Sequence, residues 1–170
     1  TVAMPQSNTR LYRQDEGDAL YRRSLYTFWK RSAPPPSMEI FNAPTREHFT
    51  VRRERTNTPL QALVVMNDPQ FVEASRHLAQ RALREVGGFD PQLDFVTTRL
   101  VARSFDDAER AVARRTYDRL LGAYEADTDA ARELLEVGES APDETLPAAE
   151  SAAWTMLVNQ VLNLDEALNK

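Results

Sequence analysis

The fold of this chain is decided by residues 58–88, which read TPLQALVVMNDPQFVEASRHLAQRALREVGG. Thr58 before Pro59 and Asp68 before Pro69 each combine an N-cap side chain with proline at the first helical position, so two helices should start here in succession. The second is the most regular in the chain, because an apolar stripe recurs at helical spacing until a pair of glycines ends it. The stripe consists of Phe71, Ser75, Leu78, Ala79, Ala82 and Val86.

Helical periodicity continues after this stretch. Further helices are predicted from Asp90 to about 101, from Ser104 (capped with Asp107) to about 126, over 129–137, and from Pro147 onward. The expected inward residues are Leu93, Val96, Leu100, Val101, Ala108, Val112, Leu120, Leu121, Tyr124, Trp154, Leu157, Val158, Val161 and Leu162. Because the connections are short, neighbouring helices should pack antiparallel. The sequence therefore predicts an all-α, irregular bundle of six or seven helices in a single domain, 1–170.

The first 58 residues are less regular. Residues 1–14 lack periodicity and are expected to form a polar lead-in. Over 15–32, Tyr21, Leu25, Phe28 and Trp29 fall at helical spacing, which predicts a helix with its aromatic side chains in the core. Three consecutive prolines then stop any helix. Residues 33–58 should form a long, ordered Pro- and Arg-rich strap, with a short strand around Val51 as the alternative.

Composition narrows the chemistry that the chain can perform. Of its 170 residues, 42% are hydrophobic and 28% charged, which suits a folded core with a solvated surface. The absence of cysteine excludes disulfides, thiolate nucleophiles, Cys-ligated zinc and covalent haem attachment in this chain, so no cofactor is expected in it. Neither His48 nor His77 has a partner at metal-binding spacing, so no metal site is expected. No apolar run approaches the ~18 residues that span a membrane.

Charge is unevenly distributed along the chain. Residues 1–55 hold ten Lys/Arg against six Asp/Glu, whereas 56–170 hold eleven against twenty, for a net charge of −5. A net-acidic chain binds nucleic acid poorly, so nucleic acid is not an expected partner. The two halves can instead attract each other within one fold.

The densest polar feature is TVRRERTNTP, residues 50–59. Arg52, Arg53 and Arg55 are suited to binding carboxylate, sulfate or phosphate bidentately. Asn57 adds a hydrogen-bonding group at a helix N-terminus, which itself favours anions. We expect this cluster to act as a clamp that orders the strap. The structural alternative is that the arginines pair with carboxylates of the same fold.

Two further groups of residues are candidates for a binding interface or for acid–base chemistry. Arg22 and Arg23 are interleaved with aromatic residues, a pattern seen in proteins that stack on nucleic acid or sugar, although aromatic side chains at helical spacing favour the core. Glu47 beside His48 forms a conceivable acid–base pair, and Glu54 is a third candidate acid or base.

Several stretches resemble a known family. RRSLYTFWKR (22–31), APPPSMEIFNAP (33–44) and VRRERTNTPLQALVVMNDPQFVEA (51–74) resemble the C-terminal domain, of unknown function, of planctomycete-type cytochrome-associated exported proteins. LLEVGES (134–140) and AAWTMLVNQVLNLDEAL (152–168) are similar to the end of that domain.

The resemblance implies a C-terminal segment of a longer, extracytoplasmic polypeptide, often preceded by a c-type haem domain and a middle domain. It does not imply a reaction. Members often have aspartate at the position of Asn42 and cysteine near that of Phe49.

Two functions follow from these patterns. The first is a helical scaffold or interaction module that uses the strap to dock on the preceding domains of the same polypeptide, because long ordered loops tend to form interfaces. It predicts an exposed apolar or charged patch on that side. The alternative is part of an enzyme site acting on an anionic (sulfated or uronic) polysaccharide, with the arginines binding substrate and Glu47, His48 or Glu54 as acid or base.

Overall fold

The computed structural model describes residues 15–30 and 34–169. Within these ranges the chain is helical and contains no strand, so the all-α prediction is confirmed and the strand around Val51 is not formed. The helices are α1 (Pro36–Ile40), α2 (Pro59–Asn67), α3 (Pro69–Glu85), α4 (Phe89–Leu100), α5 (Asp107–Ala126), α6 (Thr128–Leu135), α7 (Ala148–Leu162) and α8 (Asp165–Leu168). The lead-in at 1–14 lies outside the described residues.

Both start signals of residues 58–88 act as predicted. The Thr58 side chain accepts a hydrogen bond from the Gln61 backbone N–H at 3.3 Å, and the Gln61 side chain accepts one from the Thr58 N–H at 2.9 Å. This reciprocal capping box fixes the start of α2. Asp68 caps α3 by accepting from the Gln70 N–H at 2.9 Å. α2 and α3 therefore follow each other with a single residue between them.

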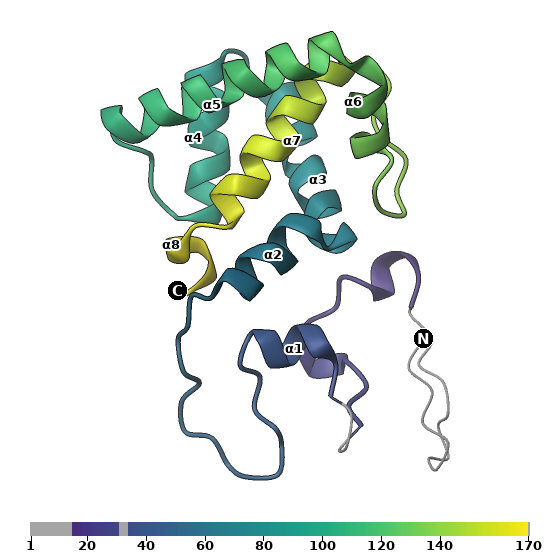
Figure 1. The fold of residues 1–170 in the computed structure, drawn as a ribbon, viewed down its shortest axis with the longest axis vertical. Helices are drawn as coiled ribbons and strands as arrows, with labels where there is room; N and C mark the ends of the chain where they lie inside the picture. The colour runs from purple at the N-terminus through teal and green to yellow at the C-terminus, as the bar shows by residue number, and fades with distance from the viewer. Residues whose placement is uncertain (1–14, 31–33, 170) are drawn as a thin grey trace.

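Helix α7 is the centre of the bundle and packs against α3, α5 and α6 (Figure 1). Its Trp154 is fully buried, with ring centroids 5.3 Å from both Phe89 and Tyr117. Tilted aromatic pairs at this spacing are favourable beyond the area they bury. Because Phe89 lies in α4 and Tyr117 in α5, this aromatic triad joins three helices around one side chain.

The start and the phase of α5 differ from the prediction. Asp106 and Glu109, rather than Ser104 and Asp107, form its capping box, because glutamate at the third position can reach back to the N-cap N–H. In the second half of the helix the predicted Leu120, Leu121 and Tyr124 pack against the core. In its first half Ala113 and Tyr117 are the buried residues, whereas the predicted Ala108 is exposed and Val112 is 53% exposed. The contact between Tyr117 and Trp154 fixes the rotation of the helix, which the apolar pattern alone does not.

The helix expected over 15–32 is not formed in its described part. Two 3-10 turns, Gly17–Ala19 and Ser24–Tyr26, take its place. Tyr21, Leu25 and Phe28, predicted to be in the core, are 51%, 75% and 55% exposed. Helical spacing alone does not stabilise a short helix, because most helical stability comes from a surface that covers the apolar face.

The proline run also acts differently from the prediction. Pro36 occupies the first turn of α1, where its missing N–H costs nothing, so the run starts a short helix. The strap consequently contains α1 followed by an irregular segment up to Thr58.

A buried carboxylate fastens the N-terminal segment to the bundle. Glu73 of α3 is 2% exposed and accepts hydrogen bonds from Tyr21 Oη, from the backbone N–H groups of Glu139 (3.1 Å) and Ser140 (2.7 Å), and from Ser140 Oγ. The Arg76 guanidinium lies 3.3 Å away. Burial alone would raise the pKa of Glu73, but the hydrogen bonds lower it to about 2. Partial burial and the Glu73 carboxylate raise the pKa of Tyr21 to about 12.

The loop after α6 approaches Glu73 closely at Gly138. This residue has φ +108°, and a Cβ placed on it would lie 2.5 Å from Glu73 Cδ.

We predict that Gly138→Ala lowers the free energy of unfolding by at least ~2 kcal/mol, from the strained backbone and the steric clash together. Gly122→Ala is the matched control, because it lies in the middle of α5 with no atom within 4 Å. The control should stabilise the protein by ~0.5–1 kcal/mol. Thermal unfolding of both variants measures the difference, and equal shifts in Tm would contradict the role of Gly138.

Stability should depend on the ionisation of Glu73. Its pKa is lower in the folded protein than the ordinary value of 4.5, so its contribution is present above about pH 4.5 and is lost as the pH falls toward 2. We predict that Glu73→Gln weakens the loss of stability over this acid range. Chemical unfolding at a series of pH values measures it, with the exposed Glu133→Gln as the control. Parallel pH profiles for all three proteins would exclude Glu73 as the main acid-sensitive group.

Candidate functional site

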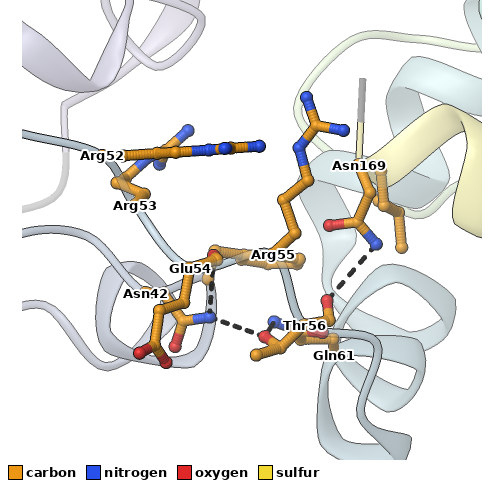
Figure 2. A pocket seen from close by; sticks show the side chains of 10 residues that line it. Asn42, Arg52, Arg53, Glu54, Arg55, Thr56, Gln61 and Asn169 are labelled. Atoms are coloured by element: carbon orange, nitrogen blue, oxygen red, sulfur yellow. Dashed lines mark hydrogen bonds between the residues drawn. The ribbon is translucent and has the colours of Figure 1, made fainter.

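The strap brings its arginines to an open pocket where the end of α1, the start of α2 and the C-terminal α8 meet (Figure 2). The pocket has a volume of about 320 Å³. Its lining residues are Phe41, Asn42, Arg52, Arg53, Glu54, Arg55, Thr56, Gln61, Leu168 and Asn169.

Side-chain amides fix the floor of this pocket. Thr56 Oγ1 accepts hydrogen bonds from Asn42 Nδ2 at 2.6 Å and from Gln61 Nε2 at 2.8 Å. The Thr56 carbonyl accepts from Asn169 Nδ2 at 3.4 Å, and Gln61 Nε2 also donates to the Ile40 carbonyl at 2.8 Å. Amides around one threonine therefore order this end of the strap, in place of the arginine clamp that the sequence suggested.

Asn42 has a backbone reason to be at its position. Its φ is 54°, a left-handed conformation that asparagine tolerates better than most residues. An aspartate, as in the family resemblance, would accept a hydrogen bond from Thr56 Oγ1 where Asn42 donates one. The hydrogen bond between this side chain and Thr56 is kept, with donor and acceptor exchanged. The difference between asparagine and aspartate at this position therefore needs no catalytic explanation.

Arg52, Arg53 and Arg55, which we call the strap arginines, are exposed, and none forms an ion pair with a carboxylate among the residues that the structure describes. Glu54 also lines the pocket, but Figure 2 shows its carboxylate and the Arg55 guanidinium on opposite sides of the strap. The bundle behaves differently, because most of its arginines are paired with carboxylates. The paired arginines are Arg76, Arg81, Arg84, Arg103, Arg110, Arg114 and Arg132. The alternative of internal pairing is therefore wrong for the strap arginines in the described part of the chain.

The other predicted candidates do not join this pocket. Glu47 and His48 are exposed on the strap and are not among its lining residues. Asn57 is exposed and is not among the lining residues, and Arg22 and Arg23 are exposed on the N-terminal segment. The structure thus assembles the predicted anion-binding arginines but not the predicted acid–base pair.

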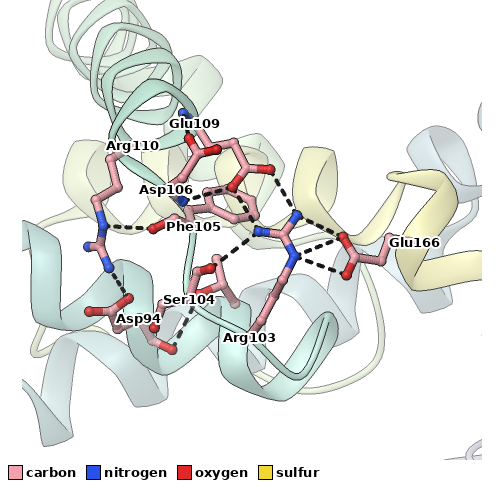
Figure 3. Close-up of polar contacts among 9 residues, drawn as sticks. Asp94, Arg103, Ser104, Phe105, Asp106, Glu109, Arg110 and Glu166 are labelled. Carbon is pink, nitrogen blue, oxygen red and sulfur yellow. Dashed lines mark hydrogen bonds and ion pairs between the residues drawn. The ribbon is translucent and has the colours of Figure 1, made fainter.

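An ion-pair cluster on the far side of α8 positions Asn169. Arg103, between α4 and α5, donates to both oxygens of Glu109 at 2.8 Å and to Glu166 of α8 at 2.8 Å (Figure 3). Hydrogen bonds from Arg103 and from the Asp106 backbone lower the pKa of Glu109 to about 2, and the two carboxylates raise the pKa of Arg103. Through Glu166, this cluster holds α8 against the bundle. Glu166 lies three residues before Asn169, whose side chain donates to the Thr56 carbonyl.

Sequence reasoning placed Thr56 in the polar stretch 50–59, but it did not identify Asn42, Gln61 or Asn169 as members of the site. Only the capping-box spacing of Thr58 and Gln61 was visible locally. The remaining contacts join residues that are far apart in the sequence and carry no motif.

Ser140 and His77 lie close together but do not form a nucleophile and its base. His77 Nε2 is 2.7 Å from Ser140 Oγ, and Arg76 donates to the same oxygen at 2.7 Å. The Ser140 hydroxyl donates its proton to Glu73, so that proton is not available to the imidazole. The His77 side chain is half exposed at the surface of α3.

The described ranges contain neither a metal-binding cluster nor a membrane-spanning helix. No cluster of three or more histidine, aspartate or glutamate side chains there is arranged to hold a metal ion. None of the described helices is long and apolar enough to cross a bilayer.

Residues 1–117 match the family described as PSD1, protein of unknown function (DUF1553). The chain belongs to this family. The PSD1 match covers the strap and every pocket residue except Leu168 and Asn169, and it ends within α5. The similarity at 134–140 and 152–168 lies beyond it. No curated protein and no solved structure matches the chain.

Loss of the amide floor should free the strap. We predict that Asn42→Ala, which removes the bonds to Thr56 and to the Glu54 carbonyl, speeds tryptic cleavage after the strap arginines about 5-fold, equivalent to ~1 kcal/mol of local opening. Asn42→Asp should cleave at nearly the parental rate, because its carboxylate can accept from Thr56. Asn67→Ala is the control, since that side chain bonds only to its own helix, at the Leu63 carbonyl. Equal cleavage of the alanine and aspartate variants would show that the Asn42 side chain does not hold the strap.

Proposed function

We propose that the chain is a helical interaction module that docks on the preceding domains of the same polypeptide. The observation that carries the proposal is the distribution of exposed apolar side chains. Nine of them, which we call the apolar end, are Tyr21, Leu25, Tyr26, Phe28, Phe49, Val51, Leu60, Leu63 and Met66. The only other large hydrophobic residues exposed in the described ranges are Val112 and Leu164.

The position of the apolar end also supports docking. In Figure 1 the segment before α2 lies at one end of the molecule, and α3 to α7 form the bundle at the other. The bundle covers its own core with Trp154 and its neighbours. In the segment before it, Leu25 and Tyr26 lie on a 3-10 turn and Phe49 lies on a loop, and all three are at least 70% exposed.

The energetic cost of leaving these side chains in water is substantial. Phe49 is 93% exposed and Val51 is 91% exposed. Covering a side chain of this size contributes ~1.5–3 kcal/mol, and soluble proteins seldom expose large contiguous apolar patches without a binding role. Burial of only part of the apolar end would stabilise a docked domain appreciably.

The proposal includes a cellular setting taken from the family resemblance. The partner domains would be those of a cytochrome-associated exported protein, and the location would be extracytoplasmic. The exposed position of Phe49, near which family members often have cysteine, suits a residue that meets a partner surface.

A second candidate function is part of an enzyme site acting on a sulfated or uronic polysaccharide. One observation favours it, the three arginines that line an open pocket without an internal carboxylate partner. The exposed Glu47 and His48 lie outside that pocket, which leaves Glu54 as its only lining acid or base. A sulfated oligosaccharide that binds through these arginines and is then cleaved would establish this class.

Docking predicts protection of the apolar end in the complete natural polypeptide. Amide exchange over residues 15–66 should be slower there, by about 10-fold or more, than in the 170-residue chain alone, because covered backbone opens less often. Leu63→Asp should reduce the protection, since it places a charge in the interface. Val112→Asp is the matched control, because Val112 is 53% and Leu63 55% exposed. Identical exchange in the long and short proteins would rule out docking through this surface.

A further inference from the structure

We infer that the arginine pocket receives the carboxylates of an acidic polypeptide segment on the docked domain. This inference rests on the proposed docking function and names the chemistry of the partner. The juxtaposition behind it is a pocket lined by Arg52, Arg53 and Arg55 that continues along the chain into the exposed apolar residues of the strap and of α2.

The arginines of the strap and those of the bundle differ in their ion pairing. In the bundle, most guanidinium groups lie within 4 Å of a carboxylate, including the 2.8 Å pairs of Arg84 with Asp143 and of Arg103 with Glu109. The strap arginines have no such partner among the described residues, although residues 56–170 carry a large surplus of acid. The carboxylates that would complete the same pattern at the strap must come from outside the described fold.

Several hydrogen-bond donors of the pocket are already used within the fold. The amide N–H groups of Asn42, Gln61 and Asn169 already bond to Thr56. The donors that remain free are the guanidinium groups, which present paired N–H groups in the geometry that a carboxylate accepts. Glu54 does not occupy them, because its carboxylate is on the other side of the strap (Figure 2). The pocket is therefore selective for an acceptor with negative charge.

The exposed apolar residues beside the pocket favour a polypeptide over a carbohydrate as its ligand. Phe49 and Val51 immediately precede the arginines, and Leu60 and Leu63 follow them on α2, all of them more than half exposed. Aliphatic and aromatic side chains of a protein can cover such residues, whereas a sulfated sugar leaves the aliphatic ones in water. Among the described residues, Phe41 is the only aromatic one that lines the pocket, which offers little stacking area for sugar rings. An acidic segment with neighbouring apolar residues matches both halves of the surface.

Zero-length cross-linking tests the inference directly. Arg53→Lys keeps the positive charge and introduces an amine that a carbodiimide couples only to a carboxylate in contact with it. The native chain has just two lysines, Lys30 and Lys170, so new cross-linked peptides are easily assigned by mass spectrometry. In the complete natural polypeptide we expect the introduced lysine to couple to an aspartate or glutamate outside residues 1–170. Arg115→Lys, at an exposed arginine of α5, is the matched control and should give no such product.

A charge-removal pair provides a second readout. Arg53→Gln with Arg55→Gln should lower the amide protection of residues 49–57 in the complete polypeptide about 10-fold. Arg115→Gln with Arg119→Gln makes the same change in charge on α5 and should leave that protection unchanged.

The outcomes separate this inference from the docking proposal. If residues 15–66 are protected but the lysine at 53 couples only to carboxylates of residues 1–170, or to none, docking stands and the acidic partner segment is wrong. A heparin-derived tetrasaccharide that binds the 170-residue chain, and loses binding with Arg53→Gln and Arg55→Gln, would overturn it in favour of a carbohydrate. Absence of both protection and coupling would overturn the two together.

Discussion

Burial of α7 on nearly all of its sides is the constraint on which the rest of this structure depends. Trp154 at its centre is packed against Phe89 and Tyr117, which sets the positions of α4 and α5. One turn later the buried Asn159 donates from Nδ2 to the Val65 carbonyl of α2 at 2.9 Å. The amide satisfies a carbonyl near the end of that helix that would otherwise lack an intrahelical partner. The core therefore places α2 as well as the helices that contain its aromatic residues.

The position of α2 is passed on to the surface pocket. Gln61, which closes the capping box of α2, also bonds to Thr56 and to the Ile40 carbonyl. From the other side, α7 leads into α8, and Asn169 after α8 bonds to the Thr56 carbonyl. The pocket floor is thus built by elements anchored in the core, while its arginines remain in solvent. A rigid floor with free cationic donors is pre-organised for a ligand, because little further ordering is needed on binding.

Charge and apolar exposure lead to the same functional conclusion. In the bundle, most arginines are paired with carboxylates and the aromatic residues around Trp154 are buried. Before α2, Arg52, Arg53 and Arg55 have no carboxylate partner among the described residues, and several large apolar side chains are exposed. Uncovered apolar side chains favour contact with another protein surface, and unpaired arginines favour acidic groups on that surface. For this member of the PSD1 family, binding to another protein surface is therefore the role that we propose. The strap and its pocket are the region proposed to bind.

The sequence by itself determined the helices that carry their own start signals and the stripe of α7, because capping residues and helical periodicity act over a few neighbouring positions. It also singled out the arginine cluster, Arg52, Arg53 and Arg55, that lines the pocket. Only the tertiary structure decided that the described residues 15–30 do not form one helix, that α5 faces inward with Tyr117, and that Thr56 is held by Asn42 and Asn169. Those outcomes depend on which surface lies opposite a residue. Contacts such as the one between Thr56 and Asn169, 113 positions apart, leave no local pattern to read.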